Sequence, residues 1–168
     1  MLASVPKSIP LLVLVAGLSA GTVDIGVAAL IYSLRPVVIL ESIASGLIGD
    51  GAFRGGVAVV LLGLGLQWAM SILVATIYVA ITALRPSVRR RWGRTGALAG
   101  FTNYVVMSYL VVPLSAAPFG PVFTLHGLFA GLTPYKLTIN VLANVLFGVI
   151  IAFCVRSAAP PEAPPASS

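Results

Sequence analysis

Long apolar runs dominate the chain and predict helices that are long enough to cross a lipid bilayer. Four such runs are near or above the length of about 18 residues expected of a spanning helix. They cover residues 11–34, 57–84, 95–114 and 137–155. At a rise of about 1.5 Å per residue, each run reaches across a hydrocarbon core of about 30 Å. We therefore predict an all-α polytopic membrane protein, a four-helix bundle within residues 1–156.

A shorter apolar run follows the first predicted span. Residues 37–49 are too few to cross a bilayer, and they place Glu41 on one helical face and Leu40 on another. Pro36 suits the first position of a helix, and Gly49 suits its end. We expect a short helix that lies on the outer surface or dips into it as a re-entrant segment.

The first run is interpreted as a retained helix rather than a cleaved signal peptide. It continues without interruption past Ala20 to Leu34. Leu18 is also a poor residue three positions before a cleavage site. The Pro-, Ala- and Ser-rich residues 157–168 differ from the runs and predict a disordered cytoplasmic tail.

Composition supports the membrane assignment. Hydrophobic residues make up 59% of the chain and charged residues 8%, whereas soluble domains carry about 45–50% and about 25%. The net charge of +6 does not indicate a nucleic-acid partner, because the basic residues lie at the borders of the apolar runs. The expected partner is the lipid bilayer.

The distribution of basic residues predicts the orientation. Seven of the ten precede the first run, lie between the second and third, or follow the fourth: Lys7, Arg85, Arg89, Arg90, Arg91, Arg94 and Arg156. The other three are Arg35, Arg54 and Lys136. The positive-inside rule then places both termini in the cytoplasm. We expect a multi-pass protein of a bacterial-type inner (plasma) membrane.

Each predicted span carries small and polar residues on one face, at steps of three or four positions. The polar members of this intramembrane cluster are Asp24, Gln67, Asn103, Asn140 and Asn144. Asp24, Gln67 and Asn144 lie about 10–15 Å from the outer ends of their runs, so they can meet. Because an ionised carboxylate there costs about 2.5–3.5 kcal/mol, we expect Asp24 to be protonated or partly hydrated. It either joins helices by a hydrogen bond or binds a proton or cation.

Few other residues suit chemistry. Glu41, Asp50 and His126 are the candidates on the outer face, and their spacing matches no catalytic motif. Cys154 is the only cysteine, which excludes an internal disulfide. No zinc, haem or nucleotide motif is present in the sequence. We therefore predict no catalytic residue, no metal, no cofactor and no enzymatic activity.

The sequence contains a candidate internal duplication. Residues 17–24 (GLSAGTVD) and 96–103 (GALAGFTN) share the pattern G-x-x-A-G-x-x-D/N. With a different offset, Gln67 and Ala75 align with Asn144 and Ala152. A real repeat would relate the two halves by an axis along the membrane normal.

Three stretches carry a family resemblance: GTVDIGVAALIY, ESIASGLIGDGAFRGG and NYVVMSYLVVPLSA. Over roughly residues 17–156 the chain resembles a group of uncharacterised bacterial four-span integral membrane proteins. The resemblance implies the four-span architecture and no particular activity. Relatives place histidines near the positions of Gln67 and Asn144, so the amides here argue against a metal or haem site.

Three functions compete. A buried acid and a polar face on every span favour transport of a proton, cation or small solute by a homo-oligomer, since four helices leave little room for a pore. Missing catalytic motifs, the helix at 37–49 and the Pro-rich tail suit an accessory or scaffold subunit of a larger membrane complex. A lipid-acting enzyme ranks last.

Overall fold

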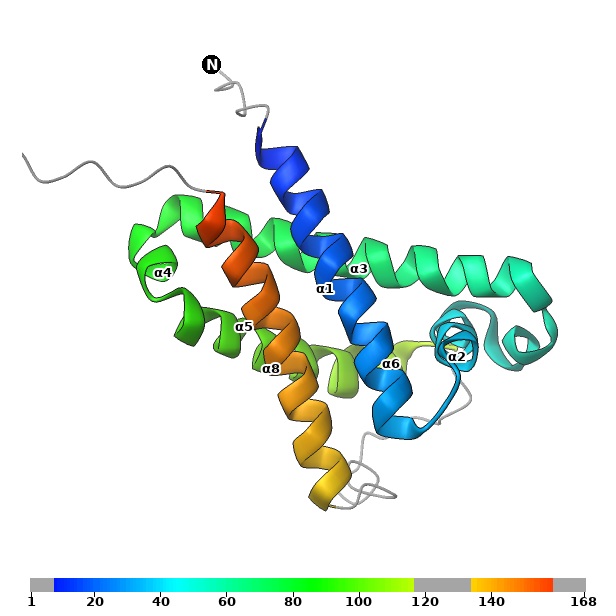
Figure 1. The fold of residues 1–168 in the computed structure, drawn as a ribbon. Coiled ribbons are helices and arrows are strands. Elements are labelled where there is room, and N and C mark those ends of the chain that lie inside the picture. Colours follow the sequence, from blue (N-terminus) through cyan, green and yellow to red (C-terminus); the bar gives the residue numbers. More distant parts are fainter. Residues whose placement is uncertain (1–7, 117–133, 159–168) are drawn as a thin grey trace, which may run out of the picture.

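The computed structural model describes residues 8–116 and 134–158, and every element in these two ranges is helical (Figure 1). The elements are α1 (Ser8–Tyr32), α2 (Pro36–Ile48), the 3₁₀ helix η1 (Gly49–Arg54), α3 (Gly56–Leu84), α4 (Pro86–Arg90), α5 (Trp92–Val106), the π-helix η2 (Met107–Val111), α6 (Val112–Leu114) and α8 (Pro134–Ser157). The predicted all-α class is confirmed for this part of the chain.

Several helices have the length and apolar character of membrane spans. Four of the five that qualify overlap the predicted runs: Ile9–Tyr32, Gly56–Leu84, Trp92–Leu114 and Pro134–Ser157. The fifth, Pro36–Arg54, joins α2 to η1. These helices are compatible with a membrane protein.

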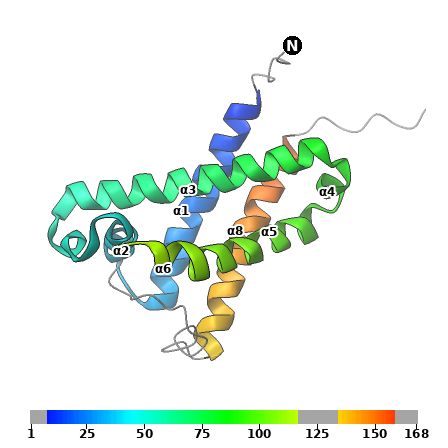
Figure 2. The same ribbon diagram turned by 180° about the vertical axis from the view of Figure 1, so that it is seen from behind.

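The four long helices form two layers. In Figure 1, α1 and α8 lie side by side in front, and α3 and α5 cross behind them; Figure 2 shows the same arrangement from the other side. Two contacts fix α1 and α8 as antiparallel. Tyr32, near the end of α1, donates a hydrogen bond of 3.0 Å to Asn140, near the start of α8. Val13 and Val155 belong to one buried cluster at the other end.

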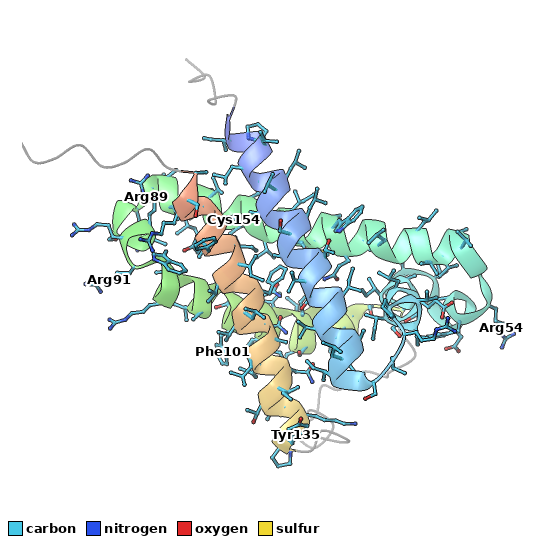
Figure 3. All side chains as sticks on the ribbon, in the orientation of Figure 1. Arg54, Arg89, Arg91, Phe101, Tyr135 and Cys154 are labelled. Carbon is cyan, nitrogen blue, oxygen red and sulfur yellow. The ribbon has the colours of Figure 1, made fainter. Side chains whose placement is uncertain are left out.

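The start of α1, the turn around α4 and the end of α8 gather at one end of the molecule. Trp92 packs against the buried cluster of Val13 and Val155, and the Arg156 guanidinium lies 5.0 Å from its ring centre. Figure 3 shows Arg89 and Arg91 at this end and Arg54 at the far end, beyond α2. Within the described residues, the beginning of α1 and the end of α8 therefore lie at the same end of the structure.

Glycines allow the long helices to approach closely. A Cβ atom on Gly17 would lie 2.7 Å from the Ile72 backbone of α3. A Cβ atom on Gly148 would lie 2.7 Å from the Gly100 backbone of α5. Small residues serve this purpose in membranes, where close backbone packing replaces the hydrophobic drive between helices.

The third apolar run is not one regular helix. α5 passes into the π-helix η2 at Met107 and then into the short α6, which contains Pro113. Proline has no backbone N–H, and its ring collides with the carbonyl four residues earlier, here that of Tyr109. A π-turn ahead of the proline accommodates both effects.

The short helix α2 packs on α3, where the backbone carbonyl of Leu40 meets Gly63. Gly49 follows α2 with a φ of +67°, a conformation that favours glycine. The Ala116 N–H donates a hydrogen bond of 2.9 Å to the Gly46 carbonyl, which ties the end of α6 to α2.

Candidate functional site

The first polar pair joins α1 to α3. Gln67 Nε2 donates a hydrogen bond of 2.8 Å to Asp24 Oδ2, and both side chains are partly buried. The close crossing at Gly21 brings them together, because a Cβ atom there would lie 2.5 Å from the Ser71 hydroxyl oxygen. The Ser71 hydroxyl in turn donates a hydrogen bond of 2.8 Å to the Gln67 carbonyl. Helix packing therefore positions the carboxyl.

The second polar pair joins α5 to α8. Asn103 Nδ2 donates a hydrogen bond of 2.9 Å to Asn144 Oδ1. Asn144 Nδ2 donates a hydrogen bond of 3.1 Å to the Asn140 carbonyl one turn earlier. The close approach of Gly100 to the Asn144 carbonyl and to Val145 sets this crossing.

Both pairs line one cavity of about 140 Å³ near the middle of the fold. Its lining consists of Asp24, Gln67, Met70, Ser71, Val74, Asn103, Met107, Asn144 and Phe147. We call this the polar cavity. Four of the five predicted cluster residues therefore lie together, contributed by four different helices.

Asn140 lies apart from the other four. Its Oδ1 accepts the hydrogen bond from Tyr32, and its Nδ2 donates a hydrogen bond of 2.8 Å to the Lys136 carbonyl. It does not line the polar cavity. Its place near the start of α8 explains the difference, because Asn144 lies one turn deeper.

The outer-face candidates do not form part of this site. Glu41 is partly exposed on α2, and Asp50 is exposed on η1; neither lines the polar cavity. His126 lies outside the described residues. Cys154 is a free, partly buried thiol on α8. Within residues 8–116 and 134–158, no group of three or more His, Cys, Asp or Glu could hold a metal ion.

Sequence reasoning missed a second, larger cavity. About 360 Å³ lies between α3 and α5, with α8 as its floor, and its lining is mostly apolar. We call this the apolar gap. Val74 and Asn103 line both spaces, so the apolar gap adjoins the polar cavity. The available signal was the stripe Thr95, Ala99 and Thr102 on α5, whose small side chains leave room.

The candidate duplication has a counterpart in the contacts. Gly17 approaches Ile72 as Gly96 approaches Val149, and Gly21 approaches Trp68 as Gly100 approaches Val145. Ile72 and Trp68 of α3 each lie 77 positions before the α8 residue that takes the same place in the second contact, Val149 or Val145. The same offset relates Gln67 to Asn144. The hydrogen bond from Gln67 to Asp24 likewise matches the one between Asn103 and Asn144. We call α1 with α3 the first helix pair, and α5 with α8 the second.

The site combines one carboxyl with three amides around one small cavity. A carboxylate binds protons and cations, and amide oxygens accept hydrogen bonds from a cation. In the part of the chain that the structure describes, neither lysine nor arginine lines the polar cavity. Comparisons with known protein families, with curated proteins and with solved structures find no match.

Proposed function

We propose that this chain is a multi-pass membrane protein that transports protons or small cations, with Asp24 as the binding group. The observation that carries the proposal is the polar cavity, where the carboxyl meets three amides from three other helices. An ionisable residue inside a membrane is costly and marks a functional site by default. Gln67 holds the carboxyl in place by its 2.8 Å hydrogen bond.

The proposed topology has four spans, with α2 and η1 at the outer surface. α2 has 13 residues, which cover only about 20 Å at about 1.5 Å per residue. The positive φ of Gly49 then breaks the helix before η1. Arginines cluster around α4 at the end where α1 begins and α8 ends, which supports cytoplasmic termini by the positive-inside rule.

The proposed transporting unit is a homo-oligomer. The polar cavity of about 140 Å³ is small for a route across a membrane, so a second copy would have to complete the path. Large apolar side chains remain exposed on all four long helices, including Leu30, Leu61, Leu98 and Leu142. These faces suit lipid or a second copy of the chain.

Flux measurement tests the role of Asp24. The purified protein is placed in liposomes, and proton and alkali-cation flux are measured for the wild type and for Asp24→Asn. We expect flux to fall by about tenfold or more in Asp24→Asn, because the amide cannot bind a proton or balance a cation. Asp50→Asn is the matched control, since Asp50 is exposed on η1, and its flux should equal that of the wild type. Unchanged flux in a folded Asp24→Asn variant would refute the proposal.

Native mass after gentle solubilisation tests the homo-oligomer. Masses at two or more whole multiples of the 17.3 kDa chain support a transporter built from copies of this protein, and a monomeric mass would contradict it. A stoichiometric foreign partner would instead favour an accessory subunit, in which Asp24 meets a group on the partner.

A further inference from the structure

The apolar gap opens sideways between two helices. Tyr78 and Thr95 join α3 to α5 at one point, where their hydroxyl oxygens lie 2.8 Å apart. Elsewhere in the described residues, α3 and α5 barely contact one another. Ile77 and Leu98 line the gap and are 51% and 64% exposed. An apolar molecule can therefore enter from the side of the protein, which faces lipid in the proposed topology.

The inner end of this entrance is polar and contains an ionisable carboxyl group. The gap reaches Asn103 and Val74, which also line the polar cavity that contains Asp24. Gln67 occupies Asp24 Oδ2, and among the described residues the other carboxylate oxygen accepts no hydrogen bond. The space therefore has an apolar outer part and a carboxylate at its inner end.

The available acceptors select the head group of a ligand. Asp24 Oδ1, Asn103 Oδ1 and the second lone pair of Asn144 Oδ1 are three acceptor positions around one cavity, and a primary ammonium has three N–H donors. Among the described residues, no lysine or arginine lines either cavity, so a phosphate or carboxylate would lack a counter-charge. Zwitterionic lipid head groups are disfavoured for the same reason.

We propose that the protein binds a hydrophobic primary ammonium, with its charged head at Asp24 and its apolar tail in the gap between α3 and α5. This inference rests on the proposed function and names the substrate class of the same site. The apolar gap, about 360 Å³, lies at the lower end of the range of about 300–1,000 Å³ typical of small-molecule sites. The tail supplies affinity by burial, and the head supplies charge selectivity.

Binding of defined probes to the full chain in lipid nanodiscs tests the proposal. Octylammonium should bind at least about tenfold more tightly than ethylammonium, since six additional methylene groups enter the gap. Octanoate, which has a similar tail and the opposite charge, should show no saturable binding. Equal binding of octylammonium and octanoate would overturn the proposal, because the site would then select only for the apolar tail.

Three variants separate the two parts of the site. Asp24→Asn should weaken octylammonium binding by about tenfold or more. Ala99→Phe fills the gap and should weaken octylammonium but leave ethylammonium unchanged. Ala69→Phe is the matched control on the exposed face of α3 and should behave as the wild type. Wild-type affinity in Ala99→Phe would overturn the assignment of the gap.

A labelling measurement covers the case in which a variant does not fold. Thr102 lines the gap and is exposed, so Thr102→Cys in a Cys154→Ser background should react with a maleimide. Octylammonium should slow this reaction by about threefold or more at saturation, whereas Ala69→Cys should react at an unchanged rate. Equal rates with and without octylammonium at Thr102→Cys would overturn the proposal.

The outcomes distinguish this inference from the proposed function. Loss of proton flux in Asp24→Asn, together with no octylammonium binding by the wild type, would overturn the ligand assignment and support the transport role. Unchanged flux in Asp24→Asn, together with octylammonium binding that depends on Asp24, would refute proton transport and support the ligand site.

Discussion

The two helix pairs have glycine contacts and a polar pair at corresponding positions, but they differ in packing and in charge. In the second pair, Gly100 and Gly148 face one another, so backbone meets backbone. In the first pair, Gly17 also meets the backbone of Ile72, but Gly21 faces the side chain of Ser71. The first pair carries the carboxyl of Asp24, whereas the second carries only amides.

This difference indicates a division of roles. α5 and α8 pack over more of their length than α1 and α3 do, so the second pair acts as the firmer support. At Gly21, the glycine of the first pair that lies nearest to Asp24 in the sequence, the contact is with the side chain of Ser71 rather than with a backbone, so this part of the first pair is the more adaptable one. A site that binds and releases a cation benefits from such a contact, since packed backbones do not deform continuously.

The largest expected effect comes from adding a methyl group between α5 and α8. Gly100→Ala would place Cβ against the Asn144 carbonyl and 2.8 Å from the Val145 backbone. We expect the free energy of unfolding to fall by about 2–3 kcal/mol, because two backbones must separate. Gly93→Ala is the matched control, since no other described residue lies within 4 Å of its Cβ position apart from its chain neighbours and the backbone of its own helix. Unfolding in mixed micelles measures both, and equal stability would contradict the backbone contact.

Exchanging the acid at position 24 with the amide at position 103 tests the difference in charge between the two helix pairs directly. The double variant Asp24→Asn/Asn103→Asp moves the carboxyl to the second helix pair within the same cavity. We expect the flux lost in Asp24→Asn to recover to within about threefold of the wild type, a level distinct from the loss of about tenfold or more in the single variant. Liposome flux of the single and double variants gives the comparison. No recovery in a folded double variant would show that Gln67 is required beside the acid.

A smaller effect is expected where a side chain can move aside. Gly21→Ala places Cβ 2.5 Å from the Ser71 hydroxyl oxygen, and that hydroxyl can rotate. The loss of unfolding free energy should be about 1 kcal/mol, below that of its counterpart Gly100→Ala. Gly26→Ala has open space around it and serves as the control on α1. A loss as large as that of Gly100→Ala would remove the distinction between the two crossings.

The smallest expected effect concerns the contact between the two pairs. Tyr32→Phe removes the 3.0 Å hydrogen bond to Asn140. Interhelical hydrogen bonds in membranes contribute about 0.6 kcal/mol on average, so a loss of that size is expected on unfolding. Tyr135→Phe is the control, because Tyr135 is 72% exposed. A loss above about 1.7 kcal/mol would exceed the measured range for such bonds and indicate a larger role for this contact.

The helical content of the chain follows from the sequence alone. Apolar runs of this length favour a lipid environment, where no water is available to hydrogen-bond with the backbone. A helix then pairs the backbone N–H and C=O groups with one another within a single segment. The positions of Asp24, Gln67 and Asn144 within their runs also predict similar depths for the three side chains, because the rise per residue of a helix is fixed. Of the two other residues in the predicted cluster, Asn103 lines the same cavity and Asn140 lies outside it.

Only the tertiary structure decided which helices meet and where space remains. The periodicity of the sequence assigns a face of polar or small residues to each helix. It does not specify which other helix that face packs against. The contact of Gly100 with Asn144 and the gap between α3 and α5 both depend on residues far apart in sequence. Packing of complete helices determines such features, because each crossing is set by the shapes of both partners.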